Sequence, residues 1–461
     1  LGSTTTTKIT NYPLNAWYVA AWDYEVTRTP LARTICDRPL ALYRTEDGKP
    51  VALADACWHR LAPLSMGKVV GKDGIQCPYH GIVYNSAGRC TSMPAQETIN
   101  PSATVPSFPV VQRHRFVWVW LGDAALANPD LIPDMHQMDH PDWVGEGKTI
   151  HADCNYQLIV DNLMDLTHEE FVHGSSIGQE ELSESDFETT HSGNTVTVTR
   201  WMKGINPPPF WKKNIQDVYP DYEGKVDRWQ IIHFEAPSTI NIDVGVAKAG
   251  TGAPEGDRSQ GVNGFVMNTI TPESSSTSHY FWSFQRNYRL ESQLITTQLR
   301  EGVTRVFGED EDMLRAQQKA IEANPDYEFY NLNIDAGSLW ARRLIDRQIA
   351  AEQRQRAADD TNHRIQNHFG HAAQGARQAG AAQVGMAQDR AAQIGPVQQR
   401  ALQRDAAKIH AGQAGVQQEI AVERGLVAGV QVRRVLDDID AGDMDVDVVR
   451  HLLAVHFRTE H

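Results

Sequence analysis

The chain has 461 residues, of which 41% are hydrophobic, and a net charge of −15. A chain of this length can form two or three domains, and its composition is that of a mostly globular protein. The negative charge argues against nucleic acid or an anionic membrane surface as the main partner. The sequence contains no run of about 18 apolar residues, so no membrane-spanning helix is expected.

The N-terminus and the five cysteines favour the cytoplasm as the location of the protein. Residues 1–7 lack the apolar core of a signal peptide. Cys36, Cys90 and Cys154 stand alone in the sequence and are expected to be small core residues. An odd number of cysteines without a secretory signal is typical of a reducing compartment.

Residues 14–125 are predicted to form a small antiparallel β domain. Runs of apolar and aromatic residues at 15–22, 40–44 and 116–120 are separated by turns that contain Gly, Pro and Asp. Three prolines between residues 129 and 141 predict a linker to the next domain.

Two short motifs in this first region combine cysteine with histidine. Cys57-Trp58-His59 is followed, after 17 residues, by Cys77-Pro78-Tyr79-His80. Zinc fingers pair cysteine with cysteine and histidine with histidine, at wider spacing. The alternating order instead suits a two-iron cluster of the Rieske type, in which each loop provides one ligand to each iron. Neutral imidazoles in place of thiolates raise the reduction potential of such a cluster. Structural zinc is the alternative.

Residues 142–354 are predicted to form a second domain with strands followed by helices. Alternating or branched apolar runs predict the strands, and apolar residues at helical spacing predict the helices. The predicted strands are 195–200, 230–234, 241–246 and 280–284, and the predicted helices are 293–324 and 339–351.

The segment 161–173 begins this second domain and contains a second group of candidate ligands. His168 and His173 lie five residues apart, and Asp165 precedes the first histidine by three. In a regular helix the second imidazole would be rotated by about 140° beyond a full turn. The two rings can converge only through a π-like turn or if the helix ends after Val172. On its own this pattern is more typical of a solvated helix face.

The Rieske motif changes the interpretation of this histidine pair, because a Rieske cluster passes single electrons and therefore needs an acceptor. Two histidines and one carboxylate form the facial triad of non-haem Fe(II) oxygenases. The third ligand should come from a distant element, and the acidic stretch 307–314 offers Glu309, Asp310 and Asp312. These residues could equally form a solvated helix face or cap a helix that restarts after Gly308.

Residues 355–461 form a low-complexity tail. All 11 Trp lie upstream of it, and Gln recurs every five residues from 378 to 403, a period that fits neither helix nor strand. We predict a disordered or loosely helical tail. A partner-binding tail and a stretch that is not a selected protein sequence are the alternatives.

Taken together, the motifs resemble the Rieske non-haem iron oxygenase α subunits, and within them the oxygenase components of vanillate O-demethylases. The likeness covers residues 10–354 and includes five further segments, at 175–179, 207–211, 226–231, 270–274 and 333–337. Two features depart from the family pattern. Trp58 stands where Pro is more usual, and the tail has no counterpart.

The resemblance implies an α+β protein. An N-terminal antiparallel β Rieske domain would be followed by a helix-grip catalytic domain, in which a curved antiparallel sheet wraps a long helix. A [2Fe–2S] cluster and a mononuclear Fe(II) would be the cofactors. The implied cluster ligands are Cys57, His59, Cys77 and His80, and the implied ligands of the mononuclear iron are His168, His173 and Asp310.

The resemblance also implies roles for two residues near the mononuclear iron. Asn162 would lie beside the iron without binding it. Asp165 would bridge two subunits of a homotrimer, its carboxylate bonding to His168 and to a Rieske histidine, His59 or His80, of the neighbouring subunit.

The implied function is the O-demethylation of a methoxylated aromatic acid such as vanillate, which uses O₂ and NADH-derived electrons and gives a phenol and formaldehyde. A separate reductase with flavin and an iron–sulfur centre would supply the electrons. This fits the lack of a Gly-x-Gly-x-x-Gly fingerprint between a predicted strand and helix. The alternatives are another substituted aromatic acid, halogenated or sulfonated, as substrate, a Rieske electron carrier without oxygenase activity, and a binding protein that uses the cavity of the second domain.

Overall fold

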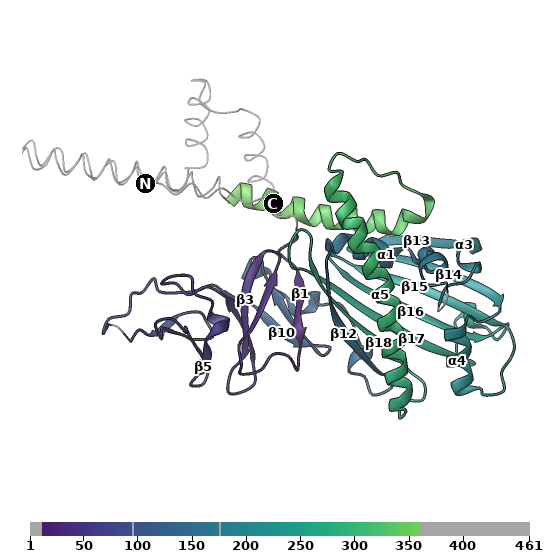
Figure 1. Ribbon diagram of the computed structural model, residues 1–461, viewed down its shortest axis with the longest axis horizontal. Helices are drawn as coiled ribbons and strands as arrows, with labels where there is room; N and C mark the ends of the chain where they lie inside the picture. Colours follow the sequence, from purple (N-terminus) through teal and green to yellow (C-terminus); the bar gives the residue numbers. More distant parts are fainter. Residues whose placement is uncertain (1–11, 95, 175–176, 360–461) are drawn as a thin grey trace, which may run out of the picture. The chain divides into compact units, whose positions relative to one another are not determined.

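The computed structural model describes residues 12–94, 96–174 and 177–359, which fall within one compact unit that ends at Asp359. The described chain is of the predicted α+β class, with four antiparallel sheets and two long helices (Figure 1). Most of the predicted tail, residues 360–461, lies outside the described residues. The limits 14–125 and 142–354 stay predictions for the two domains.

Three small sheets form the N-terminal part of the described chain, in the strand orders β1-β11-β10, β2-β3-β4-β9 and β5-β6-β7-β8. The predicted strands at 15–22, 40–44 and 116–120 correspond to β1, β3 and β11. The 3₁₀ helix η1 (Leu64–Met66) follows the first cysteine–histidine motif. The strands are β1 (Trp17–Trp22), β2 (Leu31–Ile35), β3 (Arg38–Arg44), β4 (Pro50–Ala54), β5 (Lys68–Val70), β6 (Gly74–Gln76), β7 (Val83–Tyr84), β8 (Cys90–Ser92), β9 (Ser107–Phe108), β10 (Val110–Arg113) and β11 (Phe116–Trp120).

The segment predicted as a linker is packed against its neighbours. It contains the 3₁₀ helices η3 (Pro129–Leu131) and η4 (His136–Met138), and η2 (Ala124–Leu126) precedes it. Ile132, Met135 and Met138 are buried in one apolar cluster with Trp118 of β11 and Phe281 of the large sheet. The segment therefore connects the N-terminal strands to the large sheet through apolar contacts, unlike a free spacer.

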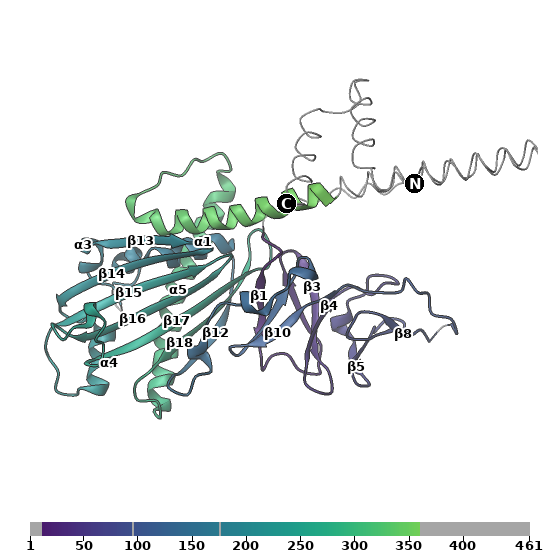
Figure 2. The ribbon, with the colours of Figure 1, turned by 180° about the vertical axis from the view of Figure 1, so that it is seen from behind.

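The large sheet has seven antiparallel strands in the order β12-β18-β17-β16-β15-β14-β13 (Figure 2). The predicted strands correspond to parts of β14, β15, β16 and β18. The bounds are β12 (Val144–Ala152), β13 (Phe187–Ser192), β14 (Thr195–Ile205), β15 (Val226–Glu235), β16 (Thr239–Lys248), β17 (Gly261–Pro272) and β18 (Ser278–Arg286).

The long helix α5 (Gln293–Ala323) packs against β12 and β18 and crosses one face of this sheet (Figure 1). It matches the helix predicted at 293–324. The Ser292 hydroxyl accepts the N–H of Ile295 and caps its start. The remaining short elements are α1 (Tyr156–Met164), η5 (Leu166–His168), α2 (Glu169–Val172), α3 (Glu181–Glu184), α4 (Pro209–Val218), η6 (Ala253–Glu255) and η7 (Asn333–Asp335).

A last helix spans 336–359 and is longer than the predicted 339–351. Leu344 and Ile345 belong to the main core. Near its end, the buried carboxylate of Glu352 accepts the backbone N–H groups of Leu14, at 2.9 Å, and Asn15, at 2.7 Å. This last helix therefore holds the residues just before β1, although the two segments lie far apart in the sequence.

The N-terminal strands dock on one end of the β17–β18 hairpin. The Thr271 hydroxyl donates to the Val19 carbonyl at 2.7 Å, and the Cys36 N–H donates to the Pro272 carbonyl at 2.8 Å. In both ribbon views β5 and its neighbours lie on the far side of β3 from the large sheet. Across the part of the chain that the structure describes, no helix combines the length and the apolar character needed to cross a membrane.

Candidate metal centres and active site

Two loops with the same backbone bonding pattern hold the cysteine–histidine motifs. In each loop the cysteine N–H donates to the carbonyl five residues later, and the N–H four residues later donates to the cysteine carbonyl, at distances between 2.8 and 3.1 Å. That fourth residue has a positive φ in both loops, 57° at Leu61 and 74° at Gly81. Leu61 thus adopts a conformation that glycine takes more easily.

The four predicted cluster ligands lie at the tips of these loops. Cys57 and Cys77 are buried, whereas the rings of His59 and His80 are exposed, with centroids 4.7 Å apart. The Tyr84 hydroxyl lies 3.2 Å from Cys57 Sγ. Two buried thiols and two adjacent exposed imidazoles are the donor set that a Rieske cluster requires. The individual ligand roles stay predictions.

The segment 161–173 is interrupted twice. α1 ends at Met164, and Asp165 is extended and accepts the N–H of Thr167 on its carboxylate at 2.9 Å, which caps η5. α2 then ends at Val172, so His173 lies beyond the helix end, which is one of the two alternatives that the sequence left open. The break at Asp165, which was not predicted, also turns His168 toward His173 and Asp310.

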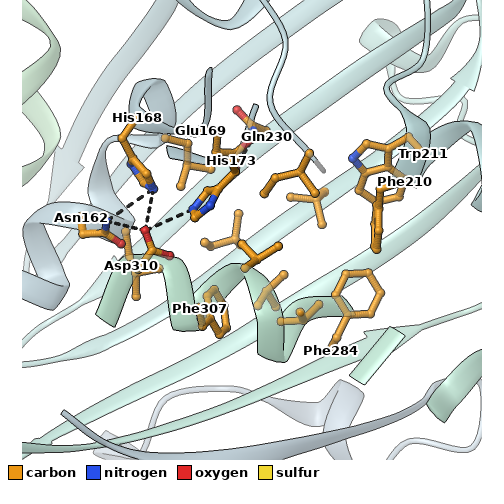
Figure 3. A pocket seen from close by; sticks show the side chains of 18 of the residues that line it. Asn162, His168, Glu169, His173, Phe210, Trp211, Gln230, Phe284, Phe307 and Asp310 are labelled. Atoms are coloured by element: carbon orange, nitrogen blue, oxygen red, sulfur yellow. Dashed lines mark hydrogen bonds and ion pairs between the residues drawn. The ribbon is translucent and has the colours of Figure 1, made fainter. Parts of the chain in front are cut away.

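The predicted mononuclear ligands converge on one point (Figure 3). The ligand atoms of His168, His173 and Asp310 all lie within 4.8 Å of one another. Oδ1 of the buried Asp310 is 3.1 Å from Nε2 of His173 and 3.3 Å from Nε2 of His168. Two imidazole nitrogens and one carboxylate oxygen at this separation fit the facial triad of a non-haem iron.

The other acidic candidates for the third ligand have different contacts. Glu309 Oε2 lies 2.6 Å from Nδ1 of His173, where it can fix the orientation of the ring. Asp312 is exposed and pairs with Arg315 at 3.0 Å. Of the three acids, only Asp310 lies among the histidine Nε2 atoms.

The charges of the group suit a cation. Burial acts to raise the pKa of Asp310, but hydrogen bonds and opposite charge from His168 and His173 lower it to about 2. Burial likewise acts to lower the pKa of both histidines, but Asp310 more than offsets this and raises them. Without a metal, the imidazoles provide the positive charge that stabilises the anionic carboxylate, and a bound metal cation can provide that charge instead.

Asn162 and Asp165 lie beside this group. Asn162 Nδ2 donates to Asp310 Oδ1 at 3.1 Å, and its place next to the iron stays a prediction. The resemblance implied a bond between the Asp165 carboxylate and His168. In the structure it is the backbone carbonyl of Asp165 that accepts from His168 Nδ1, at 2.7 Å. The Asp165 carboxylate lies 4.0 Å from the guanidinium of the buried Arg200.

A largely apolar cavity opens onto the metal group. Concave, mostly apolar sites with a few polar groups are typical of small-molecule binding. Its polar wall is a buried pair of Glu169 and Arg228 at 3.0 Å, and Gln230 Nε2 donates to the same carboxylate at 3.0 Å. The sequence analysis missed these residues. The only local signal is that Arg228 and Gln230 alternate on one face of β15. The other lining residues are mainly apolar or aromatic, among them Leu163, Phe210, Trp211, Ile242, Val244, Val266, Phe284, Val303 and Phe307.

Comparison with known proteins identifies both halves of the described chain. A sequence profile of the Rieske [2Fe-2S] domain matches residues 16–109, and one of the vanillate O-demethylase oxygenase C-terminal domain matches residues 152–351. The vanillate O-demethylase oxygenase subunit of Pseudomonas sp. strain HR199 is 42% identical over 343 residues, which cover 74% of this chain and 96% of that protein. The toluene-4-sulfonate monooxygenase iron-sulfur subunit of Comamonas testosteroni is 40% identical over 344 residues, which cover 73% and 97%.

Solved structures agree with this result. Dicamba monooxygenase bound to 3,6-dichlorosalicylic acid is similar with a TM-score of 0.69 and 33% identity, over 74% of this chain and 99% of that chain. The same enzyme with non-haem iron and dicamba gives a TM-score of 0.65 at 32% identity, over 75% and 99%.

The chain therefore belongs to the Rieske non-haem iron oxygenases, in the family of the vanillate O-demethylase oxygenase subunits. It is an oxidoreductase of the monooxygenase type, and its cofactors are a [2Fe–2S] Rieske cluster and a mononuclear non-haem iron. The predicted family, fold class and cofactors are confirmed. The oxygenase domain at 152–351 argues against an electron carrier without oxygenase activity.

Proposed function

We propose that this protein is the oxygenase component of a two-component monooxygenase that removes the methyl group of a methoxylated aromatic acid. The observation that supports this most is the largely apolar and aromatic cavity that opens onto His168, His173 and Asp310. The relatives named for vanillate O-demethylation and for toluene-4-sulfonate oxidation support an aromatic acid as the substrate class.

The reaction inserts one oxygen atom of O₂ into a C–H bond of the methoxy group, and the resulting hemiacetal collapses to a phenol and formaldehyde. The second oxygen atom leaves as water, with two electrons from NADH and two protons. The iron, when bound, supplies the activation of O₂. The residues of the chain hold the ring between apolar side chains such as Val303 and Phe307, with the methoxy carbon toward the metal group, and exclude water from it.

A separate NADH-dependent reductase with flavin and an iron–sulfur centre is proposed as the electron donor. The absence of a dinucleotide fingerprint from the sequence supports a separate protein. The toluene-4-sulfonate relative, which is named as one subunit of a monooxygenase system, supports the same division.

A homotrimer is proposed as the assembly, with the cluster of one subunit near the mononuclear iron of the next. Exposed apolar and aromatic side chains lie on the loops that carry His59 and His80 or soon after them, and exposed side chains of this kind are typical of an interface. Asp165 is the proposed bridge, since its Oδ2 accepts no hydrogen bond from any residue that the structure describes. The exposed fractions are 42% for Trp58, 74% for Leu61, 74% for Met66 and 66% for Tyr79.

The experiment that tests the proposed function measures O₂ uptake and formaldehyde for a panel of methoxybenzoates, with a surrogate reductase and NADH. We expect at least one methoxybenzoate to give formaldehyde in equal amount to the O₂ consumed. Toluene-4-sulfonate and a chlorinated benzoate, which carry no methoxy group, test the alternative substrates. O₂ uptake coupled to oxidation of one of these, without formaldehyde from any methoxybenzoate, would contradict the proposal.

A further inference from the structure

The end of the cavity remote from the metal group is aromatic. Trp211 lies there beside Phe210 and Phe284, and its indole nitrogen is on the side of the ring that faces the metal group (Figure 3). Only 3% of the Trp211 surface is exposed. The ring centroids of Phe210 and Trp211 are 5.1 Å apart and their planes are nearly perpendicular, at 89°.

Helix α4 holds this indole in a fixed position. Pro208 and Pro209 begin the helix, and Trp211 lies in its first turn. Asn214, one turn further along, donates to the Phe210 carbonyl at 2.8 Å and accepts from the Tyr288 hydroxyl at 2.5 Å. A rigid helix and a packed ring give the indole N–H a defined direction, which a binding site requires.

The other N–H donors along the cavity wall have partners or are enclosed by protein. Nη1 of Arg228 donates to Gln179 Oε1 at 2.8 Å, and its Nη2 donates to Glu169 at 3.0 Å. Nε of Arg228 has no partner but is shielded from the cavity by surrounding atoms. In contrast, Nε1 of Trp211 is not shielded in this way, and no residue within the described ranges accepts its hydrogen.

The charge of Arg228 is also neutralised locally. Glu169 and Arg228 are both buried, and their side chains are 3.0 Å apart. A substrate carboxylate placed against this wall would meet the negative charge of Glu169 in a site of low dielectric constant. The polar wall therefore does not favour an anion, whereas a neutral N–H group can donate a hydrogen bond to charged and uncharged acceptors alike.

We propose that Trp211 determines substrate specificity by donating its indole N–H to a hydrogen-bond acceptor on the substituent of the arene remote from the metal. The acceptor is an oxygen of a carboxylate, a sulfonate or a neutral carbonyl group. The substrates are then single-ring arenes that carry such an acceptor, with or without a formal charge. This proposal rests on the proposed function for the statement that the methoxy end of the ring lies at the metal.

The test compares the binding of three probes to the full-length, metal-loaded, oxidised protein without reductant, so that no turnover occurs. The probes are 3-methoxybenzoate, 3-methoxybenzaldehyde and 3-methylanisole. The variant Trp211→Phe removes the N–H and keeps an aromatic ring. Trp143→Phe is the matched control, because Trp143 packs on Phe265 and does not line the cavity.

We expect the wild-type protein to bind the acid and the aldehyde within about tenfold of each other, and both at least about tenfold more tightly than 3-methylanisole. Trp211→Phe should weaken the binding of the acid and the aldehyde by about tenfold and leave 3-methylanisole within about twofold. Trp143→Phe should change none of the three.

Three results would overturn the proposal. One is an equal loss for all three probes in Trp211→Phe, which would mean that the ring only packs. Another is unchanged binding of the acid and the aldehyde. The third is a wild-type preference for the acid over the aldehyde of more than about a hundredfold, which would require an unpaired cation. If the variant does not fold, the wild-type comparison still decides. Formaldehyde is assayed separately, so its absence with the expected binding pattern would reject only the proposed function.

Discussion

At the residue scale, the mononuclear site depends on the hydrogen bond that orients each histidine ring through its Nδ1 atom. Nδ1 of His168 bonds to the Asp165 carbonyl at 2.7 Å, and Nδ1 of His173 lies 2.6 Å from Glu309. Both rings are therefore fixed with Nε2 toward Asp310 before a metal binds. A site with its ligands already oriented needs little rearrangement to accept iron.

Asp310→Ala removes the only carboxylate of this group. We expect the iron content to fall from about three to about two atoms per chain, because the two-iron cluster has other ligands. Product formation should be lost, and the visible spectrum of the Rieske cluster should stay unchanged. Iron analysis, absorption spectra and product assays on the purified variant measure these three quantities.

Asp312→Ala is the matched control, since Asp312 lies two residues away on the same helix but is exposed and pairs with Arg315. It should keep its iron and most of its activity. Iron loss in Asp312→Ala with an intact Asp310→Ala protein would mean that the third ligand has been assigned wrongly.

The sequence could predict the histidine pair but could not choose the acid without the family resemblance. Glu309, Asp310 and Asp312 differ only in the direction in which each side chain points from α5. That direction decides the ligand only once α5 packs near His173, which lies 137 residues before Asp310 in the chain. The residues of the cavity wall are more difficult still. Arg228 and Trp211 come from β15 and α4, and no local pattern predicts that these two elements face one cavity.

At the element scale, strands with a clear apolar pattern were predictable, whereas β12, β13 and β17 were not predicted. β12 was missed because Gly145 and Gly147 interrupt its pattern. The structure gives the reason for these glycines, since a Cβ at Gly147 would lie 1.8 Å from the Trp282 carbonyl oxygen of β18. β17, with Gly261 and Gly264, was missed in the same way.

The contact between β18 and β2 should be sensitive to acid. His279 of β18 is buried, and its Nε2 lies 3.1 Å from the Thr34 carbonyl oxygen of β2. Burial, together with the charge of Arg33, lowers the pKa of His279 to about 4, against the opposing effect of Glu273. In the unfolded chain the pKa returns to about 6.5, so the unfolded state takes up a proton first as the pH falls.

The contribution of His279 to stability is therefore complete above about pH 6.5 and is lost as the pH falls toward about 4, by up to about 3 kcal/mol. His279→Gln keeps an N–H for Thr34 and removes the titration. Urea unfolding between pH 7 and pH 5 should show a smaller decrease in the free energy of unfolding for this variant than for the wild-type protein. His140→Gln, at an exposed position, is the control, and equal pH slopes for all three proteins would contradict the prediction.

At the scale of the whole molecule, the two metal sites belong to different parts of the fold, and the proposed trimer brings them together. Asp165→Asn tests the proposed bridge. Its amide oxygen can still accept the N–H of Thr167, and its backbone can still bond His168, so both metals and the trimer should be kept. The loss of the carboxylate should slow the transfer of electrons from the cluster to the iron by at least about tenfold.

Single-turnover mixing of the reduced protein with O₂ measures this rate through the absorption of the cluster, and light scattering measures the mass of the assembly. Asp142→Asn, on an exposed position, is the control. An unchanged rate in a trimeric Asp165→Asn protein would remove the bridging role.

The order of the domains could be predicted from the sequence, but the packing of the 129–141 segment could not, because its buried methionines have partners both in the N-terminal strands and in the large sheet.

The bonds from Glu352 to Leu14 and Asn15 have a consequence for the order of folding during synthesis. They join positions 338 and 337 residues apart, so the residues just before the first strand of the cluster-bearing part are secured by the last helix that the structure describes. At ribosomal rates of about 5–20 residues per second, the nascent N-terminal part waits about 20–70 s for this contact. During that interval β1 can already pair with β11 and the cysteine loops can form, while the N–H groups of Leu14 and Asn15 still lack the carboxylate of Glu352.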